Sequence, residues 1–384
     1  MAPSRRLAFI DLLRGWAVIV MIETHVVNAT IQKSVAEAPW FDVINFINGL
    51  VAPTFLFASG MAFAVTIRRK LDSYLTPGMP LLRQVWRLLF ILLLAYILHL
   101  PHFNLKGILN GLTERQVLVF LQSDVLHCIA VSLLFLQAVL FAVRTEQRLT
   151  AVAGAMAIVI LFVTPFVWGV DWLTVMPAPF AAYLNGLHFS IFPIFPWSVF
   201  ILSGTIAGHL FARHQQAAPA AEGPSFPIRP FTQAGVALIV LSFALIPLAW
   251  VYPTYDYWRY SPAFVLLRLG IVLVLAACMM AYERKRSVSP GSLITLVGRE
   301  SLLIYSTHLM LIYGDLGPFN FRRWSDHTFS LPVALVWSVV LLAIMFLLAM
   351  AWDRVRRLEP QWKSRIQWAV FAGFLIVFLV GPFT

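Results

Sequence analysis

Long apolar segments alternate with short polar segments along almost the whole chain. A helix of about 20 apolar residues spans the roughly 30 Å hydrocarbon core of a bilayer, and each apolar segment reaches about that length. The pattern therefore predicts an all-α fold, a polytopic membrane helix bundle of about eleven transmembrane helices. They are expected at residues 8–28, 43–67, 81–100, 124–143, 149–169, 189–211, 232–252, 262–282, 292–313, 329–351 and 366–383.

One polar stretch, 212–231, has the Ala-, Pro- and Gln-rich composition of a flexible linker. We expect it to connect two sub-bundles on the cytoplasmic side. Residues 1–384 are otherwise expected to form a single integral-membrane domain. The step from Gly204 to Gly208 has the GxxxG spacing that is typical of closely packed membrane helices, so we interpret it as a packing feature within the chain.

The composition excludes a soluble globular protein, because 60% of the 384 residues are hydrophobic and only 12% are charged. A net charge of +11 raises the question of nucleic-acid binding. The basic residues, however, lie in short clusters between apolar segments of membrane-spanning length. We therefore expect no nucleic acid as partner, and we expect the excess positive charge to face anionic lipid headgroups or a cytoplasmic anionic ligand.

The basic clusters also predict the orientation of the chain. Lys and Arg in short loops are retained on the cytoplasmic side, and most of the 28 cations fall on one side when the N-terminus is placed inside. The first apolar segment is too long for the core of a cleavable signal peptide and is expected to stay as an anchor. The prediction is a multi-pass protein of the cell (inner) membrane with a cytoplasmic N-terminus.

Ionisable residues inside the first predicted helix are the most informative feature of the sequence. A charged side chain at the centre of a bilayer costs roughly 2.5–3.5 kcal/mol, so each needs a partner, a water-filled cavity or a function. Asp11, Arg14 and His25 fall within an arc of about 60° on that helix, and about 21 Å of helix axis separates Asp11 from His25. An ion pair between Asp11 and Arg14 would let both be buried.

Histidines are concentrated on the expected outer side. Of the nine, only His209 and His214 fall on the inner side of the predicted topology. Because imidazole exchanges protons near neutral pH, this concentration indicates proton-transfer chemistry at the outer face. The segment at residues 298–308 repeats the layout of the first helix, with Arg299 low and His308 about 12 Å higher.

Two further segments point to the same outer zone. Asp124 precedes His127 by one helical turn, and it either contacts the histidine, as in a catalytic triad, or simply caps the helix. In FPIFPWS, at 192–198, two prolines interrupt a helix at membrane depth, which is tolerated beside a cavity or within protein. Trp197 follows directly. No metal is expected, because neither cysteine nor carboxylate accompanies the HLPH pair of histidines at 99–102.

Five segments, taken in order, resemble the bacterial relatives of the heparan-α-glucosaminide N-acetyltransferase catalytic domain. They are RLAFIDLLRGWAVIVMIETH (6–25), APTFLFASGMAF (52–63), SDVLHCIAVSLL (123–134), FPIFPWSVFILSGTIAGHL (192–210) and GRESLLIYSTHLMLI (298–312). The start of the first segment more remotely resembles membrane acyltransferases that modify surface polysaccharides. The resemblance implies an enzyme that transfers an acyl group, in these relatives acetyl, from cytoplasmic acyl-CoA to an amine or hydroxyl of an extracytoplasmic glycan, with His25 at the position of the essential histidine.

The placement of the ionisable residues and the family resemblance together lead to one hypothesis. Acetyl-CoA or another acyl-CoA is the co-substrate, its phosphates drawn to Arg14, Arg299 and the basic loop 68–70, with Asp11 beside Arg14. His25 acts as general base or briefly as nucleophile, Asp124 or His308 orients its ring, and Trp197 lines the thioester channel. Intramembrane charges and broken helices are equally natural in a secondary transporter or flippase, and a non-catalytic assembly or sensor protein is the third interpretation. The acceptor and a homodimer stay open.

Overall fold

The computed structural model describes residues 7–217, 225–252, 254–286, 288, 291–314, 320–358 and 360–380. In this part of the chain the regular structure is helical, and the one isolated bridge, between Ile31 and Phe329, does not extend into a strand. The prediction of an all-α polytopic membrane helix bundle is confirmed.

Nine helical segments in the described ranges are long and apolar enough to cross a membrane. Each coincides with one of the predicted spans. They are Phe41–Leu75, Met79–Leu98, Val125–Val143, Glu146–Trp168, Ile194–Gln216, Ile228–Trp250, Pro262–Lys285, Leu331–Arg357 and Gln361–Val380. The chain is therefore a membrane protein, and the side on which its N-terminus lies stays a prediction.

Two predicted spans differ from this set. The first, α1 (Ala8–Thr30), has 23 residues and carries the ionisable residues Asp11, Arg14 and Glu23, and it is not among the nine. The ninth, at 292–313, was expected as one continuous helix, and that expectation is wrong. It divides at Glu300 into α14 (Leu293–Arg299) and α15 (Ser301–Tyr313), because Glu300 leaves helical geometry where its carboxylate binds Arg356 at 2.8 Å.

The remaining helix bounds follow in chain order. They are α2 (Lys33–Ala36), α3 (Phe41–Asn48), α4 (Val51–Leu75), α5 (Met79–Leu98), α6 (Leu105–Leu109), α7 (Glu114–Leu121), α8 (Val125–Val143), α9 (Glu146–Trp168), the 3₁₀ turn η1 (Trp172–Thr174), α10 (Ala178–Ala181), α11 (Ile194–Ala217), α12 (Ile228–Ala244), the 3₁₀ turn η3 (Ile246–Trp250), α13 (Pro262–Lys285), α16 (Phe321–Ser325), α17 (Leu331–Leu358) and α18 (Pro360–Val380). The linker expected at 212–231 is shortened at both ends, by α11 and α12, and its residues 218–224 lie outside the described ranges.

The chain divides into two compact units. Unit 1 comprises Met1–Leu13, Ala52–Tyr96 and Leu121–Val288, and unit 2 comprises Arg14–Val51, Ile97–Phe120 and Ser289–Thr384. Helix α1 therefore contributes its first turns to unit 1 and the rest to unit 2. Each unit is described below by itself, and the expectation of a single domain over 1–384 stays a prediction.

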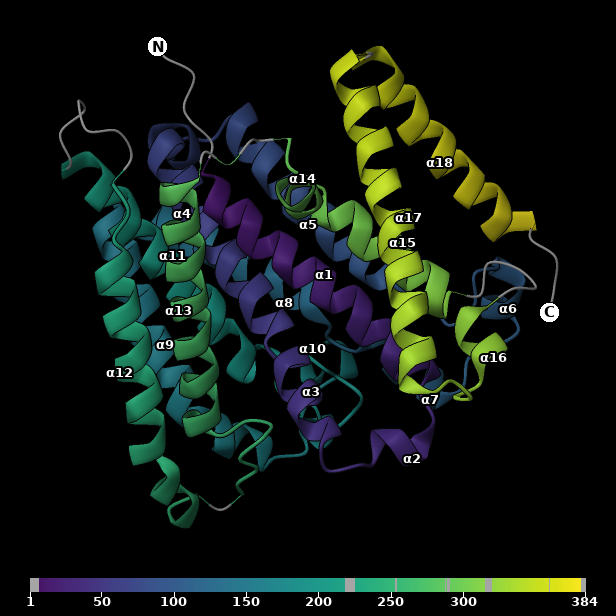
Figure 1. Cartoon of the computed structure of the whole chain (residues 1–384), viewed down its shortest axis with the longest axis horizontal. Coiled ribbons are helices and arrows are strands. Elements are labelled where there is room, and N and C mark those ends of the chain that lie inside the picture. Colours follow the sequence, from purple (N-terminus) through teal and green to yellow (C-terminus); the bar gives the residue numbers. More distant parts are fainter. Residues whose placement is uncertain are drawn as a thin grey trace. The chain divides into compact units, whose positions relative to one another are not determined.

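In unit 1, glycines let helices approach backbone to backbone. A Cβ atom added to Gly204 of α11 would lie 2.1 Å from the carbonyl oxygen of Phe57 in α4. One added to Gly60 of α4 would lie 2.0 Å from the carbonyl oxygen of Ile201. The small-residue spacing at Gly204 and Gly208 thus serves packing within the chain, as predicted. Helices α12 and α13, which Figure 1 shows side by side, meet at Gly235 and Gly270 in the same way.

Unit 2 is built around the longer part of α1. A Cβ added to Gly15 would lie 2.2 Å from the carbonyl oxygen of Ile294, so α1 and α14 are in close backbone contact. At the other end of α1, the backbone N–H of Gln32 donates to the carbonyl of Phe329 at 3.0 Å. Helix α17 contacts both α14 and α15, and α18 packs beside it (Figure 1). These contacts fix the end of α1 that carries His25 next to α15.

Candidate active site

His25 lies beside two aromatic side chains of α15, all in unit 2. The centroid of its ring is 5.3 Å from that of His308 and 5.7 Å from that of Tyr313. His308 is completely buried, whereas His25 is half-buried. The structure therefore brings together two of the predicted catalytic residues and adds Tyr313 to them.

The Tyr313 hydroxyl contacts both the backbone and the ring of His25. It donates to the carbonyl oxygen of His25 at 3.2 Å, and its oxygen lies 3.4 Å from Nδ1 of the ring. When this hydrogen goes to the carbonyl, the hydroxyl oxygen can only accept from Nδ1, so the contact favours the tautomer with the hydrogen on Nδ1 and a basic lone pair on Nε2.

The same argument applies to His308. Its Nδ1 lies 2.7 Å from the carbonyl oxygen of Ile304, which can only accept, so Nδ1 again carries the hydrogen. Its Nε2 is buried and has no hydrogen-bond partner among the described residues. Two neighbouring imidazoles thus each keep an unprotonated Nε2. They cannot hydrogen-bond to each other through these atoms, but each can accept a hydrogen from an amine or hydroxyl.

The position of Tyr313 is fixed at the end of α15. The side-chain amide of the buried Asn320 donates to the carbonyl oxygens of Tyr313 at 3.3 Å and Gly314 at 3.1 Å. Arg322 lies over the Tyr313 ring, with its guanidinium carbon 6.0 Å from the centroid. The backbone that carries the hydroxyl is therefore held by the segment that follows the helix.

A cluster of five charged residues surrounds the break between α14 and α15. Arg299 binds Glu300 at 3.1 Å and also binds Asp353 of α17, and its side chain is 9% exposed. Arg356 contacts the same two carboxylates at 2.8 and 2.9 Å, and Arg357 contacts Asp353 at 2.8 Å. Three guanidinium groups against two carboxylates leave one net positive charge, and Arg356 and Arg357 carry the more exposed side chains.

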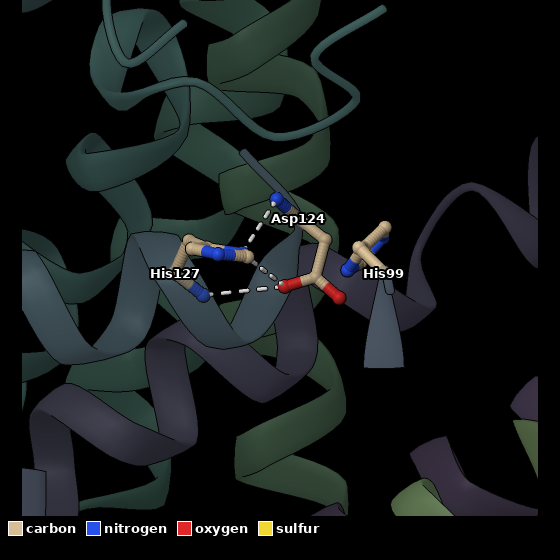
Figure 2. A group of neighbouring side chains, drawn as sticks. All are labelled: His99, Asp124 and His127. Atoms are coloured by element: carbon tan, nitrogen blue, oxygen red, sulfur yellow. Dashed lines mark hydrogen bonds and ion pairs between the residues drawn. The ribbon is translucent and has the colours of Figure 1, made fainter. Parts of the chain in front are cut away.

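Asp124 and His127 form a buried pair in unit 1 (Figure 2). One carboxylate oxygen of Asp124 accepts from the backbone N–H groups of Leu126 at 2.8 Å and His127 at 3.2 Å, and it lies 3.1 Å from Nδ1 of His127. The two alternatives left open by the sequence therefore coexist, because Asp124 caps α8 and contacts the histidine. Asp124 belongs to unit 1 and His25 to unit 2, so a role for Asp124 in orienting His25 stays a prediction.

Two tyrosines flank the His127 ring within unit 1. Tyr96 and Tyr183 have ring centroids 4.4 and 6.2 Å from it, and their hydroxyls lie 3.0 Å apart. Burial, reinforced by the hydrogen bond with Tyr96, raises the pKa of Tyr183 well above its usual range, so this phenol stays protonated. The His127 ring is thus in contact with both tyrosine rings.

The irregular start of α11 positions Trp197. Ser123 accepts from the backbone N–H groups of Ile191 and Phe192 through its carbonyl oxygen, at 3.0 and 2.9 Å, which ties the segment before α11 to the start of α8. The Trp197 ring packs edge-on against Phe192 at 4.7 Å. Its predicted place along a thioester channel stays a prediction.

The other expected ligand contacts lie as follows. Asp11 is buried and Arg14 is half-buried on α1, and an ion pair between them stays a prediction. Residues 68–70, expected as a basic loop, lie within helix α4, where Arg68 binds Glu146 at 2.7 Å and His209 lies 3.2 Å from the same carboxylate. The first of these three cations is therefore held by a protein carboxylate.

Residues 6–240 match the family described as heparan-alpha-glucosaminide N-acetyltransferase, catalytic. The match covers more than half of the chain. This chain belongs to that family. The matched range of this acetyltransferase family includes His25, Asp124 and Trp197, and it ends before residues 298–312, where the resemblance stays a prediction. No curated protein matches the chain.

Sequence reasoning missed Tyr313 and Asp353 as partners of the residues it selected. Tyr313 lies five residues after His308 on the same helix, at the expected outer side, and that proximity was the available signal. Asp353 lies 54 residues from Arg299 in the sequence, so no local pattern points to their contact. For this acetyltransferase-family protein, the site is therefore larger than the predicted set.

Proposed function

We propose that the chain transfers an acyl group, acetyl by preference, from cytoplasmic acyl-CoA to an amine or hydroxyl of an extracytoplasmic glycan. Membership of the acetyltransferase family supports the reaction class. The observation that carries the proposal is the pairing of His25 with Tyr313 and His308, since it gives His25 the tautomer that a general base requires. The location in the cell (inner) membrane follows from the predicted orientation.

The chemistry assigns one task to each nitrogen. Nε2 of His25 takes a proton from the attacking amine or hydroxyl as that atom bonds to the thioester carbonyl carbon. The carbon–sulfur bond then breaks, and the imidazolium returns the proton to the CoA thiolate. Nε2 of His308 accepts a second hydrogen of an amine acceptor and so orients its lone pair. If His25 instead attacks the thioester itself, an acyl-imidazole forms first and the acceptor displaces it.

Basic residues of unit 2 are proposed to bind the phosphates of acyl-CoA. Arg14 remains part of this proposal, and for Asp11 and residues 68–70, which belong to unit 1, binding of the phosphates stays a prediction. Arg299 is buried and bound by two carboxylates, so we propose that it stabilises the cluster. Arg356 and Arg357 are more exposed, and we propose that they bind the phosphates. Guanidinium groups bind phosphate through paired N–H donors, and the cluster keeps one positive charge for it.

A transfer assay with the purified full-length protein tests this proposal. We expect label from [¹⁴C]acetyl-CoA to appear on glucosamine, used as a probe amine, with release of CoA thiol. Replacing His25 with Ala should lower the rate by about 10²- to 10⁴-fold, the usual contribution of a general base, at unchanged protein yield. His214→Ala is the matched control, since this histidine is bonded to Ser225 and lies outside the proposed site.

Two outcomes would overturn the proposal. Undiminished transfer by His25→Ala would remove His25 from the chemistry. Movement of a labelled solute into proteoliposomes without release of CoA thiol would favour a transporter instead. Label retained on wild-type protein after removal of the acceptor would identify His25 as nucleophile rather than base.

A further inference from the structure

Arg268 is a charged residue within the most apolar part of unit 1. It lies in α13 and is the only charged residue of the sequence between Pro262 and Tyr282. Placing a guanidinium in a membrane-spanning helix is costly, and such residues usually pair with a carboxylate or serve a function. The contacts of Arg268 therefore indicate which of the two applies.

Aromatic rings contact the guanidinium of Arg268. Its central carbon lies 3.8 Å from the centroid of Phe264, one turn earlier on α13, and 5.5 Å from that of Trp197 on α11. Such cation–π contacts offset part of the desolvation of the charge. These contacts provide no hydrogen-bond acceptor for the Nε–H group, which is buried without a partner in the described part of the chain.

Arg268 has no carboxylate partner in the described part of the chain. Its Nε is buried without a hydrogen-bond partner there, and no described acid forms an ion pair with it. Arg68 and Arg299, by contrast, are bound by Glu146 and Asp353. A guanidinium that is stacked but lacks an acceptor is arranged to receive a planar oxyanion from outside the protein.

We propose that Arg268 and Trp197 form, within unit 1, a binding site for a carboxylate or phosphate group of a sugar. This rests on the proposed function. Arg268 lies about 9 Å from the N-terminal end of α13, the end that the predicted orientation places outside, on the acceptor's side of the membrane. The oxyanion bonds to the edge of the guanidinium, while the face of Trp197 is suited to the C–H groups of a sugar ring. Arg268 lies beyond the matched range 6–240, so the family match does not assign it a role.

Binding measured without acetyl-CoA tests the subsite separately from catalysis. The purified full-length protein, in a neutral detergent free of phospholipid, is titrated with glucuronate, inorganic phosphate or glucose, and the thermal unfolding midpoint is followed. A ligand that binds only the folded state raises this midpoint. We expect glucuronate and phosphate to raise it and glucose to leave it unchanged.

Substitutions connect this binding to the guanidinium. Arg268→Gln should weaken glucuronate binding at least about tenfold, because a charge-assisted pair of hydrogen bonds is lost. Arg268→Lys keeps the charge without the paired donors, so its affinity for glucuronate should lie between those of wild type and Arg268→Gln. This variant preserves the test if Arg268→Gln does not fold. Arg229→Gln, which replaces an exposed arginine of the same unit, should bind like wild type.

Three results would overturn the subsite. They are a wild-type response of Arg268→Gln, equal responses to glucose and glucuronate, and stabilisation by phosphatidylglycerol alone, which would assign Arg268 to a lipid headgroup. Failure of the proposed function has a different signature, since it abolishes acetyl-CoA consumption by wild type and leaves the Arg268-dependent binding intact.

Discussion

Replacing Tyr313 with Phe tests the assignment of the proton on His25. The change removes one oxygen and leaves the ring, which packs against the His25 ring at 5.7 Å. Two interactions are lost, the bond to the His25 carbonyl at 3.2 Å and the contact with Nδ1 at 3.4 Å. Only the contact with Nδ1 distinguishes the two tautomers, and a neutral hydrogen bond contributes about 0.5–1.5 kcal/mol, so about that much preference for the basic Nε2 disappears.

Converted at about 1.36 kcal/mol per tenfold change in rate, that loss lowers the rate constant for transfer by about two- to 13-fold. The assay is the initial rate of CoA thiol release at saturating acetyl-CoA, measured across pH so that a change in the titration of His25 is also seen. Tyr282→Phe, at an exposed position of α13, is the matched control and should keep full activity. A Tyr313→Phe rate within about twofold of wild type, with an unchanged pH profile, would refute the tautomer argument.

Three further predictions concern stability, each followed by thermal unfolding in detergent. Gly204→Ala places a Cβ 2.1 Å from the backbone of the facing helix and should lower the free energy of unfolding by about 1–3 kcal/mol. Gly154→Ala is the control and should leave the stability unchanged, because the nearest neighbour of its Cβ would be 3.8 Å away. Equal effects of the two substitutions would contradict the close packing at Gly204. Asp353→Asn leaves its buried arginine partner with one carboxylate and should cost about 1.5–3 kcal/mol; an unchanged midpoint would show that the cluster does not hold α17. The hydrogen bond from His188 holds the pKa of Asp171 below its usual range, so its contribution to stability is present above about pH 4 and lost as pH falls through the lowered pKa. His188→Ala should reduce that acid-dependent step, since only the backbone N–H of Leu173 still donates to Asp171, and an identical pH profile would contradict it.

The helices could be predicted because a membrane span is a local property of about 20 residues. Nine spans follow from apolar length alone, and the packing role of Gly204 and Gly208 follows from their spacing. The break at Glu300 could not be predicted in this way, and neither could its contact with Arg356, which is distant in sequence. A hydropathy pattern contains no information about that contact.

The candidate site was partly accessible to the same reasoning. The charge layout of α1 and of residues 298–308 selected His25 and His308, and the structure places their rings side by side. The charge layout did not select Tyr313, which contacts His25 although 288 residues separate the two in the sequence. It also selected Arg299 as a phosphate ligand with no sign of the carboxylate of Asp353 that binds it. Partners distant in the sequence thus decide what each ionisable residue can do.

The central claim is that an acetyl group crosses the membrane at His25, and inside-out membrane vesicles test it most directly. The vesicles carry the protein in their membrane and glucosamine in their lumen. [¹⁴C]acetyl-CoA is added only outside, at the cytoplasmic face. The account predicts labelled N-acetylglucosamine in the lumen and CoA thiol in the medium, both abolished by His25→Ala. Acetylation that occurs only when glucosamine is outside with acetyl-CoA, or luminal product that persists in His25→Ala, would contradict it.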